Sequence, residues 1–484
     1  MALEYHFGID FGTTNSSTVG YYRASGDAQW VKMRFEDEEG LPTPSFVAID
    51  RATGEVHSGR DAWNRRMELS STCECIPSVK SLLDSGWKKT IAGKTWTACD
   101  VATQVFLALK KTAYEGFGAE IASATVAIPI GFSPSKREQV RRAATCAGIA
   151  IESFISEPTA AYFANYNELK SCETVAMFDW GGGTLDVSVV ENNSGCLTEL
   201  ATNGIKLGGD DIDRKVALKI HSKVARDKGQ PIAFDDMPLV AQDRILVKAE
   251  RAKRVLSDDD DTSIFLGSYG ELGAFRESLS YEWFEAIIEP EINKAMKCLE
   301  DTISDSGVGL ANIDRVVMIG GSSNLRPLLE RMEEKYGDKI FFPDETMWSI
   351  GDGAARLSIN PGMYYAAQDL GLILSDGSYF PILRKGEKVK GWNSSTSFGL
   401  VDHTEDARLI FAGSRDLDRA SDRYWVFTVP QYGFLQEKII LKSSFDDNLI
   451  FKVAAKSSMK PSKHWATWDY DRLKCYYRLS ELGL

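Results

Sequence analysis

Two stretches of the sequence place an aspartate just before a turn rich in glycine or threonine. They are YHFGIDFGTTNSSTVGYY, residues 5–22, and MFDWGGGTLDVSVV, residues 177–190. Glycine adopts positive φ at no steric cost, and such a turn presents consecutive backbone N–H groups that bind anions, phosphate above all. Because Asp10 and Asp179 would repel a phosphate, the pattern predicts a hydrated magnesium ion between them. A plain hairpin without a ligand is the alternative for either stretch alone.

The two stretches form an internal repeat. Aligning Asp10 with Asp179 places Gly12 against Gly181, and the residues that follow correspond as well. Two related phosphate hairpins indicate two related halves of the chain. A duplicated hairpin that faces its twin would hold a triphosphate from both sides, with the cleft between the halves as the binding site.

The stretch AERAKRVLS, residues 249–257, predicts a helix with one polar face. Its polar residues recur at i, i+3, i+4 and i+7, where a buried helix would place apolar ones; they are Glu250, Lys253, Arg254 and Ser257. An arginine plane can stack on adenine while the carboxylate and the lysine reach ribose hydroxyls. Gly320 and Gly321, in IGGSSNLRP, would let the backbone approach the nucleoside from the other side. A solvated stripe with a Glu–Arg pair at i, i+4 is the alternative.

The elements that would position these residues alternate between strand and helix in the first 360 residues. Residues 98–118 predict an amphipathic helix that ends at glycine, and 123–149 predict a strand followed by a helix. Glu157 precedes Pro158, where an extended residue leads into a helix. From LGGDDID to about residue 256 the sequence predicts a long helical region. The pattern therefore predicts an α/β domain.

The pattern changes near residues 359–362. From 370 to 484 the segments are short, alternating and bounded by turns, which predicts a separate all-β domain. In LIFKVAAKS, for example, Leu449, Phe451, Val453 and Ala455 would share one face of a strand.

The bulk composition limits the class of protein. The chain has 484 residues, 43% of them hydrophobic, and a net charge of −13, which indicates a globular protein without a general affinity for nucleic acid or anionic membranes. No apolar run approaches the ~20 residues that span a bilayer, and no leader is evident. The eight cysteines form no CxxC pair and the five histidines are isolated, so neither zinc nor a disulfide framework is expected. We expect a cytoplasmic protein with reduced thiols.

The chain resembles the heat shock protein 70 (DnaK-like) chaperone family from residue 5 to about 360. The matching strings, in order, are GIDFGTTNS, TPSFVAI, VKSLL, VAIPIGFSPSKREQVRRAATCAGI, ISEPTAA, FDWGGGTLDVSVV, LGGDDID, ERAKRVLS and IGGSS. The hairpins alone would fit the wider actin and sugar-kinase superfamily, whereas ERAKRVLS and SEPTAA belong with the chaperones. The resemblance implies a duplicated, actin-like, two-lobed ATPase domain that uses ATP, ADP and Mg²⁺.

The resemblance also implies a role for individual residues. Asp10 and Asp179 would hold magnesium through its waters, and Glu157 would accept a hydrogen bond from that water shell. Lys80 looks like the family lysine that orients the attacking water near the γ-phosphate. Thr184 and Asp186 resemble the pair that positions water and binds a monovalent cation, K⁺. The implied phosphate-binding residues are Gly12, Thr13, Thr14, Asn15, Gly181, Gly182, Gly183, Thr184, Gly208 and Gly209. The implied adenosine-binding residues are Glu250, Lys253, Arg254, Ser257, Gly320, Gly321, Ser322 and Asn324.

The domain prediction follows from the same comparison. Residues 1–362 would form the ATPase domain, with lobes at about 1–175 and 176–362. Residues 363–371 would be the linker, and 372–484 a β-sandwich-like domain that binds client polypeptide without a helical lid.

Four departures from the family pattern qualify that prediction. The segment MYYAAQDLG lacks the leucine-rich character of the family linker, and Asn324 stands where an arginine near the base is common. The sequence stops at Leu484, where the family continues into a lid and tail, so we expect a short, lidless, non-standard member with fast peptide exchange. Trp180 replaces an aliphatic residue and is expected to pack in the core.

The sequence thus predicts a slow ATPase that controls client binding, with J-domain proteins and exchange factors as partners. A nucleotide-switched co-chaperone or regulatory module is the first alternative. A metabolite kinase of the same superfamily is the second, and the ERAKRVLS cassette disfavours it.

Overall fold

The computed structural model describes residues 3–37, 40–129, 131–359, 363–400, 405–413, 424–432, 436–459, 465–470 and 475–479. The chain divides into two compact units. The first unit comprises residues 1–130, 139–191 and 200–359. The second comprises 131–138, 192–199 and 360–484, so it takes two short segments from inside the range predicted for the ATPase domain.

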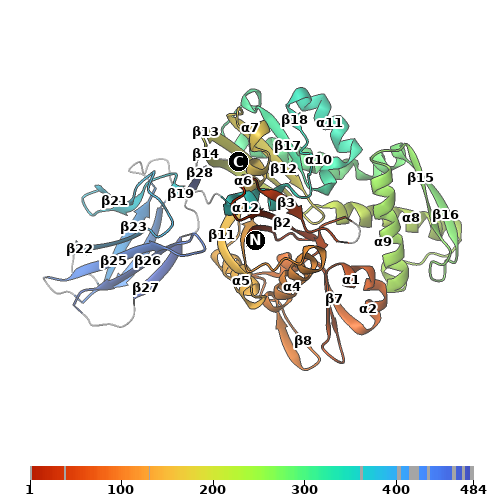
Figure 1. The fold of residues 1–484 in the computed structure, drawn as a ribbon, viewed down its shortest axis with the longest axis horizontal. Coiled ribbons are helices and arrows are strands. Elements are labelled where there is room, and N and C mark those ends of the chain that lie inside the picture. The colour runs from red at the N-terminus through yellow and green to blue at the C-terminus, as the bar shows by residue number, and fades with distance from the viewer. Residues whose placement is uncertain are drawn as a thin grey trace. The chain divides into compact units, whose positions relative to one another are not determined.

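Two sheets repeat one arrangement (Figure 1). In the first, strands β1 and β2 form an antiparallel hairpin and β10 runs parallel to β1. In the second, β12 and β13 form the hairpin and β17 runs parallel to β12. The first sheet has the order β11-β10-β1-β2-β3, with β4 paired to β2. Its strands are β1 Leu3–Asp10, β2 Asn15–Ala24, β3 Val31–Arg34, β4 Thr43–Pro44, β10 Ser123–Ile128 and β11 Ala150–Ser156. The second includes β12 Thr174–Trp180, β13 Leu185–Asn193, β14 Cys196–Ile205, β17 Arg315–Ile319 and β18 Ile340–Phe341.

Several helices between residues 98 and 164 begin or end where the sequence signals lie. Helix α4, Ala98–Phe117, starts at a capping box formed by Thr97 and Asp100 and ends at Gly118, whose φ is 63°. The predicted strand and helix at 123–149 are β10 and α5, Pro134–Cys146. Ser156 caps α6, Glu157–Ala164, by accepting a hydrogen bond from the Thr159 N–H, and thereby fixes Glu157 in the first turn.

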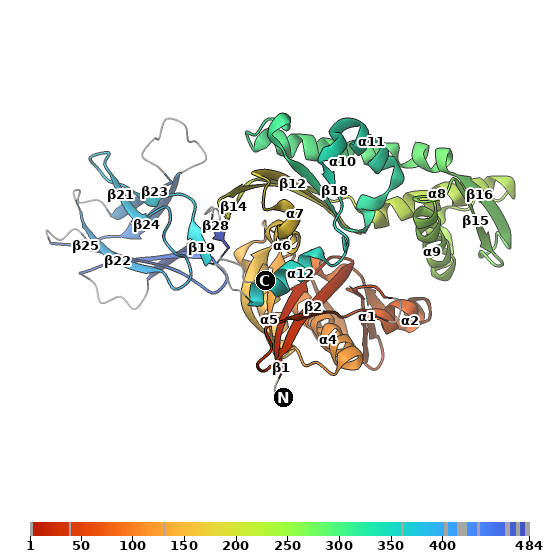
Figure 2. The same cartoon turned by 45° about the horizontal axis from the view of Figure 1, so that its top comes forward.

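Helix α12, Ser349–Ile359, packs closely against α6 and β1 (Figure 2). A Cβ on Gly353 would lie 1.7 Å from the Ala160 carbonyl oxygen, and one on Gly8 would lie 2.1 Å from the Ala355 nitrogen. Only glycine permits these approaches, because any larger residue would collide with backbone.

The long helical region predicted to end near 256 is two helices, α8 Gly209–Asp227 and α9 Leu239–Val255. Ser257 therefore lies in the turn after α9. The other elements of the first unit are β5 Val47–Asp50, β6 Val56–Ser58, α1 Gly59–Asn64, α2 Arg66–Thr72, β7 Cys73–Ile76, α3 Val79–Leu82, β8 Lys88–Ile91, β9 Lys94–Thr97, α7 Tyr166–Leu169, β15 Asp261–Leu266, β16 Phe275–Ser280, α10 Tyr281–Asp305 and α11 Arg326–Tyr336, with short 3-10 turns at Phe234–Asp236, Leu310–Asn312, Gly321–Asn324 and Gly337–Lys339.

The second unit contains two four-stranded antiparallel sheets that share one apolar core. One has the order β21-β20-β23-β24 and the other β22-β25-β26-β27. The strands are β20 Leu370–Ile373, β21 Tyr379–Leu383, β22 Asn393–Gly399, β23 Asp406–Ala412, β24 Tyr424–Pro430, β25 Lys438–Phe445, β26 Phe451–Ser457 and β27 Ala466–Tyr470. Phe451, Val453 and Ala455 share the buried face of β26, as the alternation predicts, whereas Leu449 precedes the strand with a φ of 60°.

The segment predicted to be a linker is itself paired. Its first four residues form β19, Met363–Ala366, and its end falls in β20. Strand β28, Cys475–Arg478, lies between β19 and residues 196–198 of β14 and pairs with both. Tyr477 of β28 is buried and packs edge-on against Tyr364. Within the described ranges, no helix is long and apolar enough to cross a membrane.

Candidate functional site

The two predicted phosphate hairpins lie face to face within the first unit. A Cβ on Gly182 would lie 2.5 Å from Thr14 Oγ1, and one on Gly183 would lie 2.8 Å from Thr13 Cγ2. Asp10 is the last residue of β1 and Asp179 the last but one of β12, so each lies where its strand enters its hairpin. Segments about 170 residues apart in the printed sequence thus meet at one point, and the lack of side chains on the glycines makes this approach possible.

Each hairpin is braced from within. The Gly181 N–H donates to the Thr184 carbonyl oxygen at 3.0 Å. The Gly12 N–H donates to Ser16 Oγ at 3.2 Å, and the Ser45 hydroxyl donates to the Gly12 carbonyl at 3.0 Å. Ser16 and Ser45 are buried supports that the sequence reasoning missed, although both stand in strings that match the family. Asn15 begins β2 and is exposed.

Lys80 and Glu157 form a buried ion pair, with 2.7 Å between Nζ and Oε1. Burial raises the pKa of Glu157 to about 7, against the lowering effect of Lys80. Burial alone would lower the pKa of Lys80, but Glu157 and Asp10 more than offset it and leave that pKa raised. Lys80 is therefore not an ordinary solvated surface lysine.

Four carboxyl groups interact at this point with the one ammonium of Lys80. Burial raises the pKa of Asp10, and burial together with Glu157, Asp186 and Asp10 raises the pKa of Asp179 well above its usual value. Such an excess of buried negative charge favours an added cation. Among the described residues, no three His, Cys, Asp or Glu side chains form a direct metal-ligand cluster. Carboxylate oxygens are donors that suit a hard cation such as magnesium, held here through its water shell.

The start of α8 braces the second hairpin. The N–H groups of Gly209 and Asp210 donate to the carbonyls of Gly181 and Gly182 at 3.1 and 2.8 Å. The Gly208 N–H donates to Asp211 Oδ2 at 2.9 Å. Gly208 and Gly209 thus lie beside the predicted phosphate site, but their N–H groups bind the chain itself.

Two contacts join the first half of the chain to the second. The Thr14 hydroxyl donates to Asp210 Oδ2 at 3.2 Å, and burial raises the pKa of Asp210 to about 6. The Arg66 guanidinium of α2 pairs with Asp243 of α9 at 3.1 Å. Sequence reasoning singled out neither Asp210 nor this ion pair, because both depend on contacts between distant segments.

The predicted adenosine-binding residues at 250–257 make contacts with other groups of the protein. Lys253 donates to Asp213 Oδ2 at 2.8 Å and to the Gly209 carbonyl at 3.2 Å. Glu250 and Arg254 form the i, i+4 pair at 2.6 Å that the surface-stripe alternative predicts, and Arg254 is 62% exposed. The Ser257 hydroxyl donates to the Lys253 carbonyl at 3.1 Å.

The glycine turn after β17 lies against the second hairpin. A Cβ on Gly320, whose φ is 79°, would lie 2.7 Å from Asp179 Oδ1, and the Ser322 hydroxyl donates to the Gly181 carbonyl at 3.0 Å. Gly321 and Asn324 bound the short 3-10 turn, and Asn324 is exposed.

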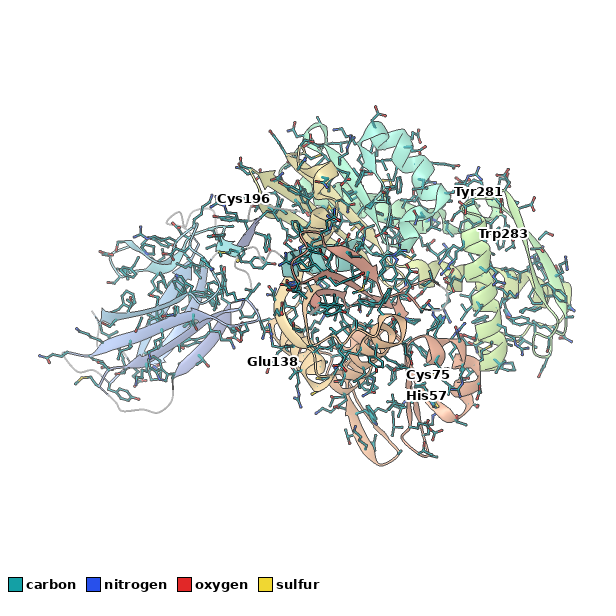
Figure 3. The ribbon with its side chains drawn as sticks, in the orientation of Figure 1. His57, Cys75, Glu138, Cys196, Tyr281 and Trp283 are labelled. Carbon is teal, nitrogen blue, oxygen red and sulfur yellow. The ribbon has the colours of Figure 1, made fainter. Side chains whose placement is uncertain are left out.

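Arg326 and Trp180 are both occupied within the protein. Arg326 pairs with Asp260 and Glu330 and covers the ring of Tyr281, which Figure 3 labels at the start of α10. The Arg326 guanidinium therefore contacts Asp260, Glu330 and Tyr281 rather than Asn324. Trp180 is fully buried and donates from Nε1 to the Leu207 carbonyl at 2.9 Å, as its expected core role requires.

A comparison with protein-family models matches residues 6–355 to the family described as Hsp70 protein. The matched range contains both hairpins, the Lys80–Glu157 pair and α9. It covers most of the chain. Members of that family are ATP-dependent chaperones that hydrolyse ATP and use Mg²⁺ with the nucleotide. The chain therefore belongs to the Hsp70 family.

Proposed function

We propose that this protein is an ATP-dependent chaperone in which an actin-like, two-lobed ATPase domain controls client binding by the β-rich region. The observation that carries the proposal is the pair of facing hairpins above the buried cluster of Lys80 and four carboxyl groups. Phosphoryl transfer depends on positioning and charge more than on a strong base, so this set of groups is chemically sufficient.

Each part of the site has a distinct proposed task. Backbone N–H groups of Thr13, Thr14, Gly182 and Gly183 would cradle the phosphates, supported by Gly12, Asn15 and Gly181. Lys80 would orient the attacking water, while Glu157 holds the lysine in place and accepts from ordered water. Thr184 and Asp186 would position water and K⁺. Bound magnesium would neutralise phosphate charge near Asp10 and Asp179.

Nucleoside binding is proposed for the other cluster. Arg254 is exposed enough to stack on adenine once it leaves Glu250, whereas Lys253 must release Asp213 before it can reach a ribose. Burial raises the pKa of Asp213 to about 7, against the lowering effect of Lys253. Gly320, Gly321, Ser322 and Asn324 would form the opposite wall, and Gly208 and Gly209 would support it through the α8 N-terminus.

Client polypeptide would bind to the β-sandwich in an extended conformation. ATP binding would lower the affinity for the client and hydrolysis would raise it, as a coupling free energy between the two sites. J-domain proteins and exchange factors are the proposed partners, and the cytoplasm is the proposed compartment. Slow hydrolysis would let the ATP-bound and ADP-bound states each persist long enough to act on the client.

Single-turnover hydrolysis tests the catalytic assignment. We expect Lys80→Ala to retain ATP binding and to lose about 10²-fold or more in the hydrolysis rate, because one positioned charge is removed from the reacting phosphate. A peptide titration with ATP and then with ADP tests the coupling. Normal turnover in the variant would overturn the role of Lys80, and no peptide binding in either state would favour a nucleotide-switched module instead.

A further inference from the structure

Helices α8 and α9 pack against each other and bring together a second group of acidic side chains, apart from the cluster around Lys80 (Figure 1). Its most buried member is Asp213 of α8, which is 8% exposed. Lys253 of α9 donates to Asp213 Oδ2 at 2.8 Å and compensates its charge. Among the described residues no group donates to the other carboxylate oxygen, Asp213 Oδ1, although that atom is buried as well. The ionised form of Asp213 therefore depends on one lysine.

The charges around Asp213 are unbalanced. Burial raises the pKa of Asp213 to about 7, and the negative charges of Glu250 and Asp210 add to that rise, while Lys253 opposes it. If the lysine charge were withdrawn, burial and the two like charges would remain and the pKa would rise further. Above neutral pH, the loss of Lys253 would thus make Asp213 bind a proton.

Two further acids lie on elements that pack against α8, and each has a cation of its own. Asp235 of the turn at 234–236 pairs with Arg214, and Glu291 of α10 pairs with Lys215. The charge balance at the buried carboxyl therefore depends on the lysine of α9.

We propose that Asp213 takes up a proton when Lys253 turns from it to a bound nucleoside, so that nucleotide binding is coupled to proton uptake. The proton would neutralise the buried carboxylate as its cation leaves, and the ammonium group would become available to ribose hydroxyls. Asp213 is a positioning residue in this scheme, because it acts through the lysine that it holds beside the Gly209 carbonyl. The inference rests on the nucleoside-binding role proposed for Lys253 and adds a proton to the ligands of that site.

The two protonation states of Asp213 fix the direction of the pH dependence. Well below the pKa of about 7 the carboxyl is protonated before the nucleotide arrives, so binding takes up no proton there. Above that pKa the carboxyl is ionised in the free protein and becomes protonated on binding. Nucleotide affinity should therefore fall as the pH rises above neutrality.

Calorimetric titration of the full chain with ADP and Mg²⁺ counts the protons taken up, when the binding enthalpy is compared between buffers of different ionisation enthalpy. At about pH 8 the terminal phosphate of ADP, with a second pKa of about 6, is ionised. Asp213→Asn keeps the shape of the side chain and removes the proton site. Asp227→Asn is the matched control, because Asp227 lies on the same helix but is exposed and pairs with Arg226. Protons exchanged at the magnesium site are common to these proteins and cancel when their counts are compared.

We expect the wild type and Asp227→Asn to take up about 0.5–1 proton more per bound ADP than Asp213→Asn. The ADP affinity of the wild type, relative to that of Asp213→Asn, should fall about threefold to tenfold per pH unit above neutrality. Lys253→Gln provides a second test if Asp213→Asn does not fold. It should bind ADP more weakly than the wild type and without the extra proton, because Asp213 would already be protonated.

Equal proton counts for the wild type and Asp213→Asn would overturn the inference and leave the proposed nucleotide binding intact. Loss of the extra proton in Asp210→Asn, but not in Asp213→Asn, would assign the proton to Asp210 and overturn it as well. No ADP binding by the wild type would count against both the inference and the proposed function.

Discussion

The two units of the protein use their interiors differently. The first buries charged groups, including Glu157, Asp213 and Asp352, each less than one-tenth exposed and each next to a lysine or arginine. The described interior of the second is aliphatic and aromatic, and its buried carboxylate, Glu437, accepts from the Tyr432 N–H and the Ser457 hydroxyl. A buried ion pair holds groups in one geometry at a high desolvation cost, whereas an apolar core stabilises without specifying charge positions.

That difference fits the tasks proposed for the two units. Nucleotide chemistry needs charges held in place before the substrate arrives. Recognition of varied extended segments needs a stable scaffold with open backbone groups at its rim. Substitutions in the first unit should therefore act through uncompensated charge, and substitutions in the second through lost packing.

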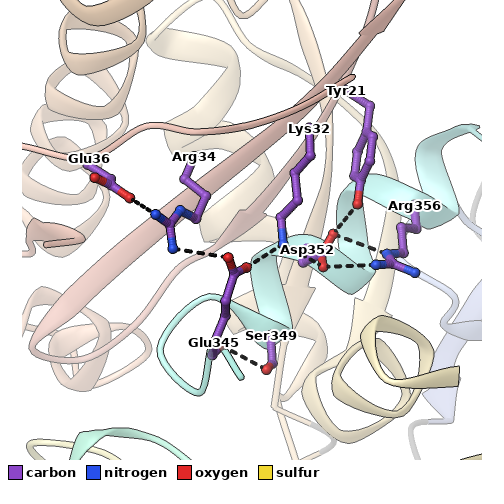
Figure 4. A network of polar contacts seen from close by, with 8 residues as sticks. All are labelled: Tyr21, Lys32, Arg34, Glu36, Glu345, Ser349, Asp352 and Arg356. Atoms are coloured by element: carbon purple, nitrogen blue, oxygen red, sulfur yellow. Dashed lines mark hydrogen bonds and ion pairs between the residues drawn. The ribbon is translucent and has the colours of Figure 1, made fainter. Parts of the chain in front are cut away.

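In the first unit, the polar network around Asp352 provides the clearest test of the effect of uncompensated charge (Figure 4). Asp352 of α12 accepts from the Tyr21 hydroxyl at 2.6 Å and from Lys32 at 2.9 Å, and it pairs with Arg356. We expect Asp352→Ala to lower the free energy of unfolding of the first unit by about 3–5 kcal/mol, because cations lose their buried partner. Urea unfolding followed by tryptophan fluorescence measures this. Glu36→Gln, at the rim of the network, is the control and should cost less than about 1 kcal/mol.

The aromatic core of the second unit provides the matching test. Phe411 is fully buried and contacts the rings of Trp425 and Phe427. We expect Phe411→Ala to destabilise the β-rich unit by about 3–5 kcal/mol through the cavity it leaves. ATP affinity should stay within about twofold of the wild type, as calorimetry would show. A parallel loss of ATP binding would contradict the separation of roles between the units.

Substitutions at the contact between the two hairpins test whether ATP binding requires the hairpins to lie this close together. In Gly182→Ala the new Cβ would meet Thr14 Oγ1 at 2.5 Å, whereas in Gly181→Ala the nearest atom, the Thr184 carbonyl oxygen, is 3.7 Å away. We expect ATP affinity to fall about tenfold in the first variant, because the hairpins must separate, and to change less than about twofold in the second. Equal affinities would show that the hairpins need not meet.

The smallest effect is expected for the ion pair between α2 and α9. Arg66 is held by Trp63 as well as by Asp243, and both charged side chains are partly exposed. We expect Arg66→Ala to speed nucleotide release about threefold to tenfold, since a half-buried pair contributes about 1 kcal/mol. Stopped-flow release of a fluorescent ADP measures it. Arg65→Ala should leave the rate unchanged, because the partners of Arg65 among the described residues are the exposed Asp61 and Glu68.

Local patterns were the part of the fold that the sequence predicted well. Helix α4 ends at Gly118 as expected, and Glu157 opens α6 beside Pro158, because caps and proline act over a few residues. The helical region to 256 was predicted as one segment but is α8 and α9, since Gly229 and Pro231 interrupt it. The segment at 363–371 gave no sign that it would pair, because its partner β28 lies more than 100 residues further along the chain.

The sequence by itself determined which family the chain belongs to and predicted a set of phosphate-binding residues, because both are written in short strings of fixed spacing. Only the tertiary structure decided what those residues contact. It buries Lys80 against Glu157, 77 positions away, and it gives Lys253 to Asp213 rather than to open solvent. It also places β24 at the end of one described sheet and β26 between two strands of the other. Spacing along the chain specifies local conformation, but pairing, burial and charge compensation depend on segments that meet only after folding.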